Sequence, residues 1–169
     1  LISLDILCRI YTNAERYNDA VALIQQHPEM WRTGRTAQAH IGAGAFEEAL
    51  SYLVQETEHV LATNHLYYIA VCLIAWAMLL ESDCRLYDRY SAPPHALMTP
   101  AERDTLAFEA LIVVRDSERI DWGTRQQADR LLVRLRSKPN ASLADAEAGM
   151  RSFRSLQELG LAMLSIRLA

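Results

Sequence analysis

Apolar residues recur with a spacing of about 3.6 residues along nearly the whole chain, and this periodicity limits the possible folds more than any other feature. No stretch alternates apolar and polar residues in the way that a half-buried strand requires. The chain has 169 residues, of which 51% are hydrophobic and 22% charged, so it is long enough to bury a core. We therefore expect one all-α domain of antiparallel helix pairs, with about eight helices in total.

Residues that break helices divide the chain into segments. Pro28 ends one helix, Gly42 and Gly44 suit a turn between two others, and Asn64 is expected to cap the start of a long apolar helix. Thr99-Pro100-Ala101-Glu102 has the form of a helix start with a capping box. The expected helices span residues 2–12, 14–27, 29–42, 45–62, 65–89, 100–116 and 121–137, with a last one from a cap at Ser142 towards Leu168. Within the single domain 1–169, the organisation is helix pairs in 1–62, a central apolar helix in 64–90, a proline-containing linker in 91–98 and C-terminal helices in 99–169.

The central apolar helix raises the question of a membrane span. Residues 66–80 carry no charge, but His65 and Glu81 close the run on both sides. A span needs about 20 apolar residues, and this run is shorter. We therefore interpret it as the central helix of a folded core, without a membrane span.

Two short segments near the front of the chain match in form. Residues 14–20 and 43–49 each contain a turn, an aromatic residue, two polar residues and an alanine, and they lie 29 residues apart. This pattern resembles the tetratricopeptide (TPR) repeat, a helix–turn–helix unit that stacks on its neighbours, although that family's usual period is about 34 residues. The resemblance covers about a third of the chain, and it implies that Ala20 and Ala49 mark close helix crossings in a TPR-like α-solenoid or a compact helical bundle.

The resemblance also implies where a partner would bind. In such arrays the first helix of each pair lines the inner, concave face, and polar residues outside the packing positions meet the partner. Carried onto this sequence, the implied partner-binding residues are Asp5, Arg9 and Asn13 in the first helix and Arg35 and Gln38 in the third.

No motif in the sequence carries catalytic chemistry. His59 and His65 lie six residues apart near Glu56, without the HExxH spacing of a metal site. Gly42-Ala43-Gly44 lacks the further residues of a phosphate-binding loop. No serine–histidine–acid grouping and no cysteine beside a base emerges from the spacing. We therefore expect no catalytic residue, no cofactor and no metal, and a protein that is not an enzyme.

Charge and cysteine usage bear on the partner and the compartment. The formal net charge is -4, and residues 1–100 carry six arginines against eleven acids. This balance argues against nucleic acid, so we interpret the basic stripe of Arg130, Arg134, Arg136 and Lys138 as a solvated helix face. The three cysteines, Cys8, Cys72 and Cys84, lie in apolar helical patterns and are expected to be reduced thiols of a cytoplasmic protein.

These observations together predict a protein-binding scaffold, adaptor or chaperone-like module that holds a partner peptide or helix on a stacked-helix surface. A narrower version is a small acidic chaperone or adaptor of a bacterial secretion apparatus. Two alternatives stay open: a regulatory or sensory helical domain of a larger protein, and an enzyme with a site between helices. The regulatory or sensory domain is supported by the ends of the sequence, because the chain starts and ends in apolar helical sequence, as a fragment would. The apolar residues 159–168 also predict a homodimer formed through the C-terminal helix.

Overall fold

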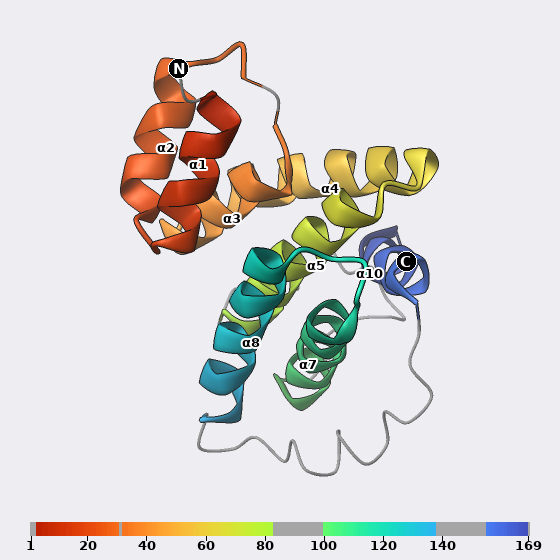
Figure 1. Ribbon diagram of the computed structural model, residues 1–169. Coiled ribbons are helices and arrows are strands. Elements are labelled where there is room, and N and C mark those ends of the chain that lie inside the picture. Colours follow the sequence, from red (N-terminus) through yellow and green to blue (C-terminus); the bar gives the residue numbers. More distant parts are fainter. Residues whose placement is uncertain (1–2, 31, 83–99, 138–154, 169) are drawn as a thin grey trace.

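The computed structural model describes residues 3–30, 32–82, 100–137 and 155–168, and every regular element among them is an α-helix. The all-α prediction is therefore confirmed for the described part of the chain. Figure 1 shows α1 and α2 side by side at one end of the molecule, and the other helices arranged around α5. The elements are α1 (Leu4–Asn13), α2 (Tyr17–Gln26), α3 (Gly34–Gly42), α4 (Phe46–Thr63), α5 (Leu66–Glu81), α7 (Pro100–Asp116), α8 (Trp122–Arg136) and α10 (Leu156–Leu168).

Helix α5 is the centre of the fold. Every residue from Ile69 to Leu80 is buried, because α5 contacts α3, α4, α7, α8 and α10. This packing explains why the uncharged run is apolar on all sides. No helix in the described ranges is long and apolar enough to cross a membrane.

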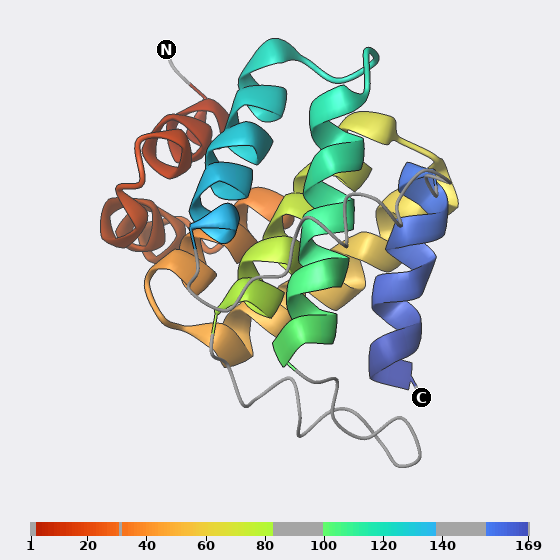
Figure 2. The same ribbon diagram turned by 90° about the horizontal axis from the view of Figure 1, so that it is seen from below.

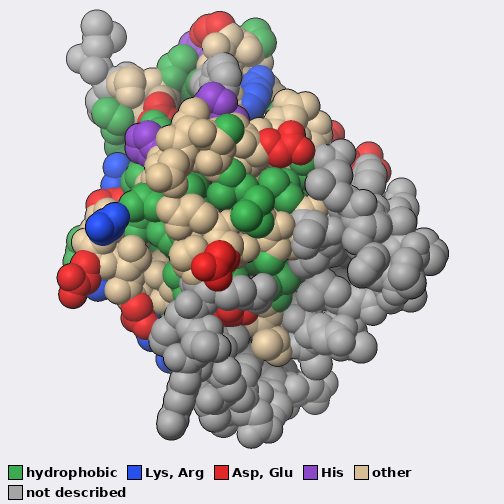
Figure 3. All heavy atoms as spheres, turned by 90° about the vertical axis from the view of Figure 1, so that its right-hand side faces the viewer, with side chains coloured by type: hydrophobic (Ala, Val, Ile, Leu, Met, Phe, Trp, Pro, Cys, Tyr) green, Lys and Arg blue, Asp and Glu red, His purple; other side chains and the backbone are tan. Residues whose placement is uncertain are grey.

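Figure 2 shows how the C-terminal helices pack beside this centre. Helix α7 lies between α8 and α10, and the far side of α8 faces α1. Helix α10 covers α4, α5 and α7 with Leu156, Leu159, Met163 and Leu164, all of them buried. Figure 3 shows the side where α4 ends and α10 lies, with a patch of hydrophobic side chains near its centre and histidines above it.

The N-terminal helices pack closely enough to need small residues. Ala20 and Ala49 are both 0% exposed, as the sequence predicts for the helix crossings. The ring of Tyr17 lies directly on Gly42, where an added Cβ would come within 2.2 Å of its Cγ. At Gly34 an added Cβ would come within 2.9 Å of the backbone nitrogen of Cys72, so α3 approaches the backbone of α5 directly.

Several helix boundaries differ from the predicted ones. Helix α2 begins at Tyr17 rather than at residue 14, because Glu15 takes a left-handed conformation with φ 57°. Helix α3 begins at Gly34 rather than at residue 29, because the Thr33 side chain caps it by accepting a hydrogen bond from the backbone nitrogen of Arg35. Gly44 lies in the predicted turn with φ 83°.

The prediction that Asn64 caps the start of the apolar helix is wrong. Asn64 ends α4 instead, in a left-handed conformation with φ 52°, and His65 precedes the first residue of α5. Asparagine suits both positions because its short amide tolerates the left-handed region. Helix α5 ends at Glu81, short of the predicted residue 89. The predicted linker 91–98, Thr99, the Ser142 cap and Cys84 lie outside the described residues.

Candidate functional site: the polar interface of α8 with α1 and α3

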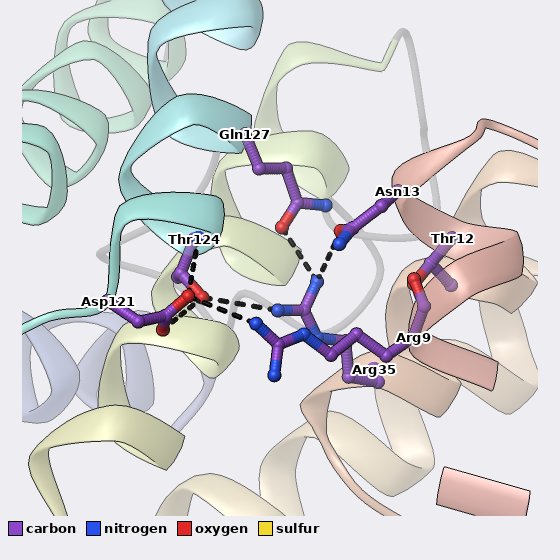
Figure 4. A network of polar contacts seen from close by, with 7 residues as sticks. All are labelled: Arg9, Thr12, Asn13, Arg35, Asp121, Thr124 and Gln127. Atoms are coloured by element: carbon purple, nitrogen blue, oxygen red, sulfur yellow. Dashed lines mark hydrogen bonds and ion pairs between the residues drawn. The ribbon is translucent and has the colours of Figure 1, made fainter. Parts of the chain in front are cut away.

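The predicted partner-binding residues come from two neighbouring helices that share one face. Asp5, Arg9 and Asn13 follow each other at intervals of one helical turn along α1, while Arg35 and Gln38 lie on α3. Helix α8 of the same chain covers this face around Arg9, Asn13 and Arg35 (Figure 4), while Asp5 is exposed. Arg35 is only 3% exposed and Gln38 is 0% exposed, so neither is open to solvent as a partner-binding face would require.

Arg35 is the centre of this interface. Its Nη1 donates hydrogen bonds to Asn13 Oδ1 at 3.0 Å and to Gln127 Oε1 at 2.9 Å. Its Nη2 donates to Thr124 Oγ1 at 3.3 Å. The guanidinium therefore joins α1, α3 and α8 through three neutral oxygen atoms, all from buried or partly buried side chains (Figure 4).

The N-terminus of α8 holds the carboxylate of the network. Asp121 caps the helix by accepting from the Thr124 backbone nitrogen at 3.0 Å and the Thr124 hydroxyl at 2.7 Å. Arg9 Nη2 donates to the same carboxylate at 3.1 Å. Burial acts to raise the pKa of Asp121, but the hydrogen bonds from Thr124 and the charges of Arg9 and Arg35 outweigh it and lower the pKa below its usual value.

Two glutamine amides extend the network into the core. Gln127 Nε2 donates to Gln38 Oε1 at 2.7 Å, and Gln38 Nε2 donates to the Val71 carbonyl at 3.0 Å. The interface thus runs from α8 through α3 to the backbone of α5. Each of the two amides donates one hydrogen bond through its nitrogen and accepts one through its oxygen, which fixes the register of α8 on α3.

Exposed contacts flank the buried ones. Arg130 donates to the Asn13 carbonyl at 3.2 Å, and Arg134 forms an ion pair with Glu15. These two arginines belong to the basic stripe that the sequence analysis interprets as a solvated face. The structure instead uses both to hold α8 beside α1, although each remains exposed. Lys138 lies outside the described residues.

Helix α8 therefore presents two different faces. Its apolar face, with Ala128, Leu131, Leu132 and Leu135, is buried and belongs to the main hydrophobic core. Its polar face, with Thr124 and Gln127, meets α1 and α3. Neither of these two residues nor Asp121 was predicted from the sequence, although Asp121, Thr124 and Gln127 lie three residues apart and so share one side of a helix.

Hydrogen bonds between polar side chains make up this interface. Guanidinium groups, amides and a hydroxyl hold neighbouring helices by hydrogen bonds, and the Asp121 carboxylate among them caps the helix. Burial raises the pKa of Cys8 to about 11 and that of Cys72 still further, so both thiols stay protonated at neutral pH. Within the described ranges no three metal-binding side chains come together.

Comparisons with known proteins add no family to this picture. No protein-family model matches the chain, and neither the curated proteins nor the solved structures give a match. Function is therefore inferred from the geometry of the site.

Proposed function

We propose that this chain is a protein-binding module of TPR-like helix pairs, whose α1–α3 face holds a helix of a partner. The observation that supports this most directly is the packing of α8, where the side chains of Arg9, Arg35 and Gln38 hydrogen-bond to the N-cap and side chains of that helix. Asn13 supports Arg35 from α1 and accepts from Arg130 through its backbone carbonyl. Four of the five residues that the TPR resemblance implies for partner binding thus line one helix-holding surface. On this proposal α8 is an internal occupant that a partner must displace.

The chemistry of the face defines the helix that fits it. Arg35 offers donors in a fixed planar fork, so it selects oxygen acceptors at set positions on the helix opposite. Arg9 adds a positive charge where the helix begins, which favours an acidic N-cap residue there. A matching partner helix carries an acid, a threonine and a glutamine at successive three-residue intervals, as Asp121, Thr124 and Gln127 do.

The proposal is tested by measuring how tightly a labelled peptide of residues 119–137 binds the unchanged protein and two variants. Each variant removes one partner of the hydrogen bond between Arg35 and Gln127. Gln127→Leu removes the hydrogen bonds that α8 makes to Arg35 and Gln38, while the residues of the α1–α3 face are unchanged. In Arg35→Met the face itself loses its donors. Because α8 competes at a high effective concentration, we expect weak peptide binding to the unchanged protein. A hydrogen bond to a charged group contributes about 1.5–3 kcal/mol, so Gln127→Leu should bind the peptide about tenfold or more tightly.

Fluorescence anisotropy gives the dissociation constants, and circular dichroism checks that both variants remain helical. Arg35→Met should bind no better than the unchanged protein. If the two variants gain peptide affinity equally, the gain reflects loosened packing, and the helix-binding face is wrong. A peptide with Thr124→Val and Gln127→Leu serves as the matched ligand control and should not bind.

The narrower version, a chaperone or adaptor of a bacterial secretion apparatus, stays a prediction from the resemblance.

A further inference from the structure

A separate cleft opens on the side of α1 that carries Asp5. It lies between α1, the segment joining α2 to α3, the second half of α4 and the start of α5, and its volume is about 490 Å³. Pockets of about 300–1,000 Å³ hold small organic ligands in proteins. None of its lining residues belongs to the network of Figure 4. The cleft is lined by Asp5, Met30, Thr33, Glu56, His59, Val60, Thr63, His65 and Tyr68.

The fixed charges in this cleft are negative. Asp5 and Glu56 supply two carboxylates, and the described lining residues include no lysine or arginine. Glu56 is only 4% exposed and already interacts within the protein, so its carboxyl group lies in a poorly solvated part of the wall. Burial, Asp5, Tyr67 and Glu56 together raise the pKa of the Tyr68 hydroxyl.

The other walls are aromatic and apolar. The Tyr68 ring lies 4.5 Å from the His65 ring and 5.0 Å from the Tyr67 ring, measured between ring centroids. Met30 and Val60 supply apolar surface in the same cleft. Negative charge next to aromatic and apolar surface suits a cation carried on an alkyl stem, because the stem covers the apolar wall while the charge meets the carboxylates and the ring face.

An adjoining hollow of about 410 Å³ shares Met30, Glu56 and His59 with the cleft and extends it towards Tyr52. It also contains Arg32, whose guanidinium lies 5.6 Å from the Tyr52 ring centroid. A cation is therefore already held on an aromatic ring at that end. A second cation finds its counter-charge at the Asp5 end, where the lining residues carry no arginine.

We propose that this cleft binds an organic cation, an alkylammonium or guanidinium group, with the exposed carboxylate of Asp5 as its counter-charge and Tyr68 as the aromatic wall. An inorganic metal ion fits less well, because the described residues bring no three metal ligands together. The same chemistry occurs in free polyamines and in the lysine and arginine side chains of proteins. The inference does not depend on the helix-binding face, since the two sites share no residue.

Isothermal titration calorimetry with three probes separates the two sources. The probes are spermidine, a blocked Gly-Arg-Gly tripeptide and a blocked Gly-Gln-Gly tripeptide, each at physiological ionic strength so that loose charge attraction is screened. Binding of spermidine alone assigns the site to free polyamines, and binding of the arginine tripeptide assigns it to a protein partner. The glutamine tripeptide should not bind.

Asp5→Asn is the informative variant because Asp5 is exposed and its replacement leaves the core unchanged. Removing one carboxylate at close range should weaken binding about fivefold. Tyr68→Leu should also weaken binding through loss of the ring face. Glu118→Gln, an exposed carboxylate outside the cleft, is the matched control and should bind as the unchanged protein does. Equal weakening in Asp5→Asn and Glu118→Gln, or no binding by either cationic probe at millimolar concentration, would overturn the proposal.

Discussion

Arg35 carries its charge inside the protein, where desolvation makes a charge costly. Its two Nη atoms find three oxygen acceptors, while its Nε makes no hydrogen bond among the described residues. A buried ionic group of this kind contributes little net stability, because its hydrogen bonds mainly offset the cost of burial. We interpret Arg35 as a residue that fixes how α8 sits, rather than as one that makes the fold strong.

Asp121 gives this network a dependence on pH. Its pKa is lower in the folded protein than in the unfolded chain, so its ionised form stabilises the fold above the unfolded value of about 4. That contribution is lost as the pH falls through the folded pKa. We expect Asp121→Asn to be less stable than the unchanged protein at neutral pH, and the difference to disappear in strong acid.

Urea unfolding followed by circular dichroism at neutral and acidic pH measures this difference. Asp116→Asn, at the exposed end of α7, controls for the general loss of a negative charge. A stability difference for Asp121→Asn that stays constant down to strong acid would contradict the assignment of the Asp121 carboxylate as the ionised helix cap.

Helix packing depends on glycine at one crossing in particular. Gly34 opens α3, and an added Cβ would meet the backbone nitrogen of Cys72 at 2.9 Å and the Cγ1 of Val71 at 3.0 Å. A backbone atom cannot move aside as a flexible side chain can. Helices α3 and α5 would have to separate, and the Gln38 hydrogen bond to the Val71 carbonyl would lengthen with them.

We expect Gly34→Ala to destabilise the protein by about 1–3 kcal/mol, although alanine favours helix more than glycine does. Gly123→Ala in α8 is the matched change. There an added Cβ meets only side-chain ends, Asp121 Oδ2 at 3.3 Å and Arg9 Nη2 at 3.5 Å. That variant should be neutral or gain up to about 1 kcal/mol from helix propensity. Thermal unfolding of the two variants compares them, and an equal effect would mean that the α3–α5 approach is not limiting.

At the scale of the whole molecule, the described residues form two apolar clusters of unequal size. The larger is built around α5, while the smaller contains Cys8, Ala20, Leu23, Ile24 and Ala39 near α1 and α2. Helix α8 contributes leucines to the larger cluster and meets α1 through hydrogen bonds and ion pairs. Polar contacts are replaced by water more readily than apolar burial is, so α1 and α8 can part at a lower cost than α8 and α7.

The predicted homodimer can be tested at α10. Most apolar side chains described for this helix are buried within the chain, but Leu161 is 59% exposed. If copies associate through the C-terminal helix, Leu161→Glu should reduce the dimer to a monomer in size-exclusion chromatography with light scattering, because it would bury an unpaired charge. Val133→Glu on α8, 60% exposed, is the control and should leave association unchanged. A monomer at high concentration for the unchanged protein would make the dimer prediction wrong.

Local spacing was enough to predict the class of the fold and most of its elements. Apolar periodicity gave helices close to α1, α2, α4, α7 and α8, and the turn at Gly44 followed from its tolerance of positive φ. The burial of Ala20 and Ala49 and the central place of α5 also followed from residue type and order. These features depend on neighbours within a few residues, and such neighbours are visible in a sequence.

The occupant of the α1–α3 face was not predictable in this way. Arg35 and Gln127 are 92 positions apart, and no spacing rule indicates that α8 covers the residues that a partner was expected to meet. The same holds for the cleft, because only the folded chain brings Asp5 and Glu56, from α1 and α4, into the lining of one pocket. Asn64 suits either end of a helix, and the chain around it decided between them. Long-range packing fixes these features, because it is the assembled core that brings distant helices together.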